Sequence, residues 1–200
     1  MLDLKEFLQE RISAYLESAP EAIISDTYAL SVFVSHESDL GIQNLEVCVG
    51  VHTESQVRER LARSGGRAYE ARWNFLVWGD PFEPFEWGIN NYQSIMGVDR
   101  DHNSVGLEFR EDWLRGRGIF GLGEEDFDNF DDYVCAQKTA AEQFLIEVAE
   151  ACVALRNKGV ISDVFGERGV LIAIHGVSDN FFDNQSTKLA NPDLEKMDFG

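Results

Sequence analysis

Two neighbouring stretches rich in β-branched and aromatic residues place the strongest constraint on the fold. They are TYALSVFVSH at 27–36 and LEVCVGVHT at 45–53, and this composition is typical of strands. The connection between them contains Asp39, Leu40 and Gly41, which are residues that favour a turn. The sequence therefore predicts a pair of antiparallel strands, whose apolar side chains helices must cover.

Two segments carry apolar residues at helical spacing. The first begins near the amino terminus and ends near Pro20, with Leu4, Phe7, Leu8, Ile12, Tyr15 and Leu16 on one face. The second runs from about 125 to 157, and its stripe contains Ala141, Phe144, Leu145, Val148, Cys152 and Leu155. A capping box of Thr53 and Gln56 predicts a short helix that Gly65 and Gly66 would close.

The remaining segments complete the expected sheet. RWNFLVW at 72–78 is bulky on both faces and predicts a third strand. GVLIAIHGV at 169–177 is also apolar on both faces, which predicts a central, covered strand. Residues 79–123 lack regular spacing, and we expect loops with one short strand or helix. Together these features predict one α+β domain over 1–200, with a mainly antiparallel sheet packed against the N-terminal helix and the long later helix.

Charge defines the class of partner. Thirty-six acidic residues against seventeen basic ones give a formal net charge of −19. Such a field disfavours nucleic acid and anionic membranes and attracts a basic protein, although acidity can also serve solubility alone. Three cysteines without CxxC spacing, no signal-like amino terminus and no long apolar run predict a soluble cytoplasmic protein.

One segment concentrates acidic and aromatic side chains. We predict that it contacts the partner through Glu124, Glu125, Asp126, Phe127, Asp128, Phe130, Asp131 and Asp132. The alternative is an acidic helix edge with its aromatics turned inward. The ligand spacing of a calcium-binding EF-hand is absent from the segment.

A second hypothesis is a small-molecule site or an enzyme pocket. The stretch 71–88 holds three tryptophans and three phenylalanines. Such side chains can anchor a loop on the core, which we favour, or can wall a pocket with Arg72, Trp78, Trp87 and His102. GRGIFG at 116–121 matches GxGxxG, but acids follow it where phosphates would lie. The arginines between 58 and 72 are expected to pair with acids such as Glu54 and Glu59.

No motif for catalysis, metal binding or a cofactor occurs in the sequence. HExxH, zinc-type His and Cys spacing, GxSxG and a P-loop lysine are all missing. The four histidines are scattered along the chain. We therefore expect no catalytic residues, no metal and no cofactor.

The order of segments resembles a known bacterial family. An N-terminal helix precedes a strand pair such as TYALSVFV and VCVGVHTE, and a strand such as RWNFLVW follows, ending in tryptophan. A long helix, an apolar strand and a terminal serine and asparagine-proline, as in Ser186 to Pro192, complete the likeness. The chain resembles the bacterial domain-of-unknown-function family 4303. The resemblance implies a role like that of immunity proteins, which neutralise toxins of competing bacteria.

Overall fold

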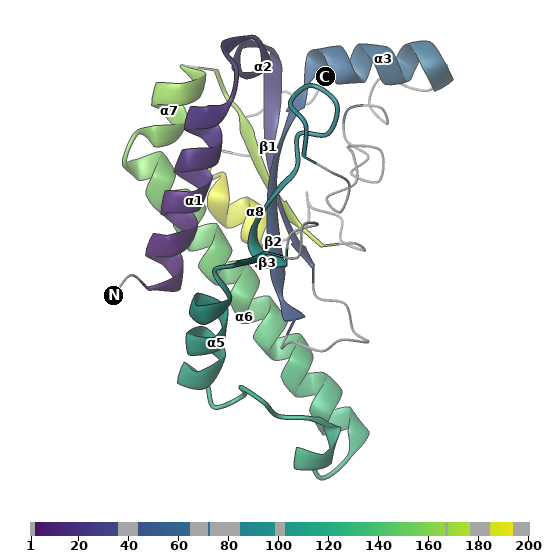
Figure 1. The fold of residues 1–200 in the computed structure, drawn as a ribbon, viewed down its shortest axis with the longest axis vertical. Helices are drawn as coiled ribbons and strands as arrows, with labels where there is room; N and C mark the ends of the chain where they lie inside the picture. Colours follow the sequence, from purple (N-terminus) through teal and green to yellow (C-terminus); the bar gives the residue numbers. More distant parts are fainter. Residues whose placement is uncertain are drawn as a thin grey trace.

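A computed structural model describes residues 3–35, 44–64, 72, 85–98, 103–166, 168–176 and 185–193. These residues form a single α+β domain with a five-stranded sheet in the order β4-β3-β2-β1-β5. Helices α1, α5, α6 and α7 lie on one side of this sheet in Figure 1. The predicted fold class, a mainly antiparallel sheet packed against an N-terminal helix and a long later helix, is confirmed.

The helices begin where capping residues occur. Asp3 and Glu6 form a reciprocal capping box at the start of α1, which satisfies amides that lack a partner within the helix. Thr53 and Gln56 do the same before α3, as predicted. The helices are α1 (Leu4–Ser18), α2 (Glu21–Asp26), α3 (Glu54–Ser64), α5 (Leu107–Gly116), the 3-10 turn η3 (Glu124–Asp126), α6 (Phe130–Asn157), α7 (Val160–Phe165) and α8 (Gln185–Ala190).

The strands are β1 (Thr27–Ser35), β2 (Glu46–Thr53), β3 (Gln93–Val98), β4 (Ser104–Val105) and β5 (Leu171–His175). The predicted antiparallel pairing of β1 with β2 is confirmed, with Ser31 opposite Gly50. Strand β5 instead runs parallel to β1, with Ala173 opposite Ser31. The sheet is therefore mixed but mostly antiparallel.

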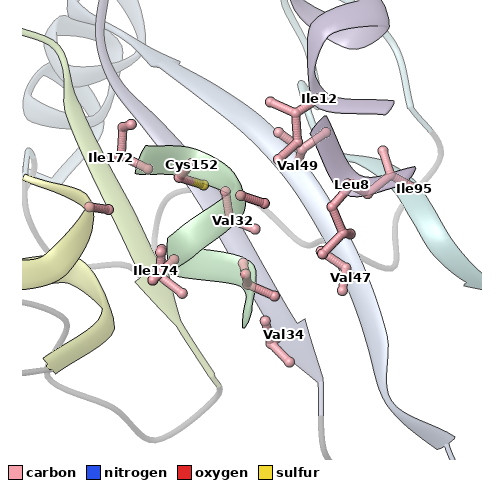
Figure 2. Packing of buried hydrophobic residues seen from close by; sticks show 14 of the residues in the cluster. Leu8, Ile12, Val32, Val34, Val47, Val49, Ile95, Cys152, Ile172 and Ile174 are labelled. Carbon is pink, nitrogen blue, oxygen red and sulfur yellow. The ribbon is translucent and has the colours of Figure 1, made fainter. Parts of the chain in front are cut away.

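Alternation along the strands divides the sheet into two faces. Val32 and Val34 of β1, Val47 and Val49 of β2 and the isoleucines of β5 point toward the helices. Figure 2 shows these side chains meeting Leu8 and Ile12 of α1 and Cys152 of α6. All of those side chains are completely buried. This layer is the main core, and it fixes α6 along the sheet.

Two expectations about the sheet are wrong. Strand β5 lies at the end of the strand order and is not central. Its faces are both buried, as the sequence suggested, but α8 covers its outer edge. Residues 79–123 hold more regular structure than the expected single short element, because β3, β4 and α5 all form there.

Some predictions fall outside the described residues. The strand expected at 72–78 lies outside the described residues, except for Arg72. Gly65 and Gly66, which the sequence predicts to close α3, lie outside them as well. Within the described ranges, no helix combines the length and the apolar character that a bilayer crossing requires.

Candidate functional site

The segment 124–134, which we call the acidic surface, spans η3 and the first residues of α6. Asn129 caps α6, because its Oδ1 accepts a hydrogen bond from the amide of Asp132 at 3.0 Å. The first buried residue of α6 is Ala140. Three turns of helix thus precede the part that packs on the core. In Figure 1 this end of α6 extends beyond the end of the sheet.

The acidic surface carries concentrated, unneutralised charge. It contains six carboxylates, and residues 118–137 include no lysine or arginine. All six acids are exposed. Within the ranges that the structure describes, none of the six forms an ion pair. Their field therefore extends into solvent over about one Debye length, roughly 8 to 10 Å at physiological salt.

Apolar side chains accompany these charges. Phe130 is 58% exposed and Val134, one helical turn later, is 45% exposed. The Tyr133 ring lies 5.5 Å from Phe127 and 6.4 Å from Phe130, measured between centroids. The aromatics thus form a cluster that is partly open to solvent. The alternative with all aromatics turned inward does not describe Phe130.

Helix α5 braces the neighbouring part of α6. Trp113 meets the buried Phe144 edge-on at 5.1 Å between centroids. Arg117 lies 3.9 Å above the Trp113 ring and forms an ion pair of 2.7 Å with Glu147. These contacts begin about one turn after the exposed stretch ends. They hold α6 in place while its amino-terminal end remains free to contact another molecule.

A second cluster lies on the opposite face of the sheet from the main core. We call it the histidine-hydroxyl chain: His52 of β2, Tyr92 before β3, Ser31 of β1 and His175 of β5. The Tyr92 hydroxyl is 3.2 Å from His52 Nε2 and 2.7 Å from Ser31 Oγ. Ser31 Oγ is in turn 2.7 Å from His175 Nε2. Hydrogen bonds thus connect residues from four different segments.

Glycine makes this arrangement possible. The Tyr92 ring lies directly over Gly50, where an added Cβ would approach the ring to 2.8 Å. Burial lowers the pKa of His52 well below its usual value of 6.5, and the nearby Arg60 and His175 act in the same direction. Burial also raises the pKa of Tyr92. Both side chains are therefore neutral at physiological pH.

Within the histidine-hydroxyl chain, Ser31 and His175 have the geometry of a nucleophilic serine and its general base, but a substrate could not reach them. A nucleophilic serine needs a base within hydrogen-bonding distance, which His175 provides for Ser31. It also needs a substrate at Oγ, and Ser31 is 0% exposed while His175 is 2% exposed. In this structure the histidine-hydroxyl chain links β1, β2 and β5 by hydrogen bonds, and its Ser31 hydroxyl is not exposed to solvent.

The two described residues of the proposed pocket wall, Arg72 and Trp87, contact different parts of the molecule. Arg72 forms an ion pair with Glu54 at 2.5 Å and lies 5.0 Å above the Tyr28 ring. Trp87 instead packs on Tyr15 of α1, with 5.0 Å between ring centroids. That contact agrees with the anchoring interpretation. Trp78 and His102 lie outside the described residues.

The other motifs take structural roles. Arg63 pairs with Glu59 at 2.6 Å, as expected for a solvated helix face. Residues 116–121 follow the carboxyl end of α5 and not a strand, so they lack the strand-to-helix setting of a dinucleotide-binding loop. Among the described side chains, no group of three or more His, Cys, Asp or Glu is arranged to hold a metal ion.

Comparison with known proteins adds no relative. No family model, curated protein or solved structure matches the chain.

Proposed function

We propose that this protein is a non-catalytic binding module that docks its acidic surface onto a basic protein. The observation that carries the proposal is the acidic surface, where six exposed carboxylates without ion pairs among the described residues accompany an exposed phenylalanine at the start of α6. No lysine or arginine occurs between residues 118 and 137 to offset their charge. Unneutralised charge of this kind accelerates encounter with a cationic surface.

The exposed apolar residues would supply the short-range contact that stabilises the complex after the charges have brought the two proteins together. Interface centres are enriched in aromatic residues and surrounded by polar ones. Phe130 and Val134 lie on adjacent turns of α6, so one apolar strip lies among the acids. Lysine or arginine side chains of the partner would neutralise the acids, while an apolar pocket would receive Phe130.

A toxin is the class of basic partner that the resemblance to family 4303 favours. Inhibition would then follow from coverage of the toxin surface and would require no reaction. The net charge of −19 disfavours nucleic acid and anionic membranes as partners. The free cysteines Cys48, Cys135 and Cys152 suit a reducing compartment, so we propose that the encounter takes place in the cytoplasm.

A charge-matched pair of variants tests this proposal. One variant neutralises four acids of the acidic surface: Glu124→Gln, Glu125→Gln, Asp128→Asn and Asp131→Asn. The other neutralises four exposed acids of α1, α2 and α7: Glu10→Gln, Glu17→Gln, Glu21→Gln and Asp163→Asn. Both variants lose the same number of charges. Each is immobilised beside the wild type and exposed to a lysate of the native host.

The first variant should retain about fourfold to several hundredfold less basic protein than the wild type, because the four lost charge pairs contribute roughly 0.2 to 1 kcal/mol each. The second variant should retain nearly as much as the wild type. Mass spectrometry of the captured proteins provides the measurement. Equal retention by the two variants would show that net charge alone matters and would remove the acidic surface from the proposal.

A further inference from the structure

Among the described residues, side chains and not another strand close the outer edge of β5. The amide of Ile174 donates to Thr187 Oγ1, and that hydroxyl donates to the Ile174 carbonyl, both at 2.9 Å. The amide of Ile172 donates to Asn191 Oδ1 at 2.9 Å, and Asn191 Nδ2 donates to the Ile172 carbonyl at 2.7 Å. These are the groups that a neighbouring strand would otherwise bind.

The spacing of a helix makes this substitution possible. Thr187 and Asn191 are four residues apart, which corresponds to about 6 Å along a helix axis. Ile172 and Ile174 are two residues apart, which corresponds to about 6.6 Å along a strand. Successive turns at the end of α8 therefore meet successive outward peptide groups of β5.

Arg156 of α6 fastens this arrangement. Its guanidinium donates to the carbonyls of Ala190 and Val170 at 3.0 and 3.1 Å, and to Asn191 Oδ1 at 2.9 Å. Asn191 Nδ2 also donates to the Thr187 carbonyl at 2.7 Å. The amide group of Asn191 thus has both donors and its acceptor oxygen occupied, in an orientation that only an amide satisfies.

Within the sequence of β5 itself there is no other protection against pairing. Native edge strands usually carry a charged residue or a proline, or are very short. Residues 170–176 contain no Lys, Arg, Asp, Glu or Pro, and all of β5 is buried. The opposite end of the sheet uses the other device, because β4 has only two residues. Among the described residues, the protection of this edge of β5 therefore depends on α8.

We propose that α8 is a substitute edge strand that prevents β5 from pairing with β5 of a second copy of the chain. A second copy presents the same outward groups at the same spacing. Antiparallel pairing of two such edges would be self-complementary around a twofold axis. Removal of the polar groups on α8 would leave the Ile172 and Ile174 peptides without partners, and pairing between copies would satisfy them.

The test removes these polar groups while it preserves side-chain shape, in the full-length variant Thr187→Val with Asn191→Leu. The control is Lys188→Ala, which changes an exposed residue of the same helix. Sedimentation velocity over a wide concentration range measures association, and hydrogen exchange measures protection of individual amides. The wild type and the control should remain monomeric at every concentration.

The double variant should dimerise as its concentration rises. At low concentration, the amides of Ile172 and Ile174 should exchange about tenfold to a hundredfold faster than in the wild type, because their hydrogen bonds are lost. The amide of Ala173, directed toward β1, should stay protected. At high concentration the protection of Ile172 and Ile174 should return.

A double variant that stays folded and monomeric at all concentrations would overturn the proposal, because α8 would then only stabilise the fold. If the amides of the double variant lose protection from hydrogen exchange throughout the sheet, the variant is unfolded. Thr187→Val alone is then tested, with Thr187→Ser as the control that keeps the hydroxyl. Dimerisation of the valine variant and not the serine variant would support the proposal. Monomeric behaviour of both would overturn it.

Discussion

Replacement of Gly106 with alanine should lower the free energy of unfolding by about 2 to 4 kcal/mol. Gly106 precedes α5 in a left-handed conformation with φ of 63°, which costs an alanine about 1 kcal/mol. A Cβ would also lie 2.3 Å from the ring of Phe7. That ring is buried and stacks on Phe109 at 4.2 Å between centroids, so it has little room to move.

Gly118 provides the matched control for this change. It has a similar φ of 68°, but no atom lies within 4 Å of an added Cβ. Gly118→Ala should therefore cost only the backbone penalty of about 1 kcal/mol. Urea unfolding of both variants measures the difference. Equal losses would show that Phe7 does not confine residue 106, and that the packing between α1 and α5 is looser than described.

Acidification should destabilise the protein before its carboxylates titrate. His52 is neutral in the folded protein because burial lowers its pKa well below 6.5, whereas the unfolded chain takes up a proton near pH 6.5. The unfolded state thus binds one more proton than the folded state between these two pKa values. The contribution of His52 to the free energy of unfolding should be constant above pH 6.5. Below pH 6.5 it should fall by about 1.4 kcal/mol per pH unit.

The measurement is the free energy of unfolding in urea at several pH values between 5 and 7. His52→Gln serves as the comparison, because glutamine cannot titrate but retains an amide that can hydrogen bond. The free energy of unfolding of this variant should fall less steeply with decreasing pH than that of the wild type, by about 1.4 kcal/mol per pH unit, which corresponds to one proton. An identical slope for both proteins would contradict the buried, neutral state of His52.

Periodicity in the sequence predicts the elements that have one buried and one exposed face. It identifies α1, the β1 and β2 pair and most of α6, because side-chain burial in these elements follows simple spacing. It fails for α5, where Arg110 is buried and donates to the Leu45 carbonyl. It fails for β3 as well, where Gly97 has φ of 138°, a conformation unlike regular strand.

The position of β5 could not be predicted for a different reason. A strand that is apolar on both faces looks the same in sequence whether a strand or a helix covers its edge. The residues that distinguish the two cases are Thr187 and Asn191, and they lie in a polar segment with no strand signal. Their role depends on where α8 lies in three dimensions.

The histidine-hydroxyl chain also depends on register. His52 and His175 are far apart in sequence, and their proximity arises because β2 and β5 flank β1 on either side. Ser31 lies opposite Gly50 in one neighbour and Ala173 in the other. No spacing rule links such residues. The acidic surface, by contrast, is a continuous segment, so its composition alone makes it a candidate.

The most direct test of the proposed binding function places a photoreactive phenylalanine derivative at one exposed apolar position in the living host. Position Phe130 is 58% exposed within the acidic surface, and the control position Ile89 is 72% exposed in a separate turn. Illumination should crosslink a basic protein to the probe at position 130, and the probe at position 89 should not form that crosslink. The same product from both positions, or none from Phe130, would contradict recognition through the acidic surface.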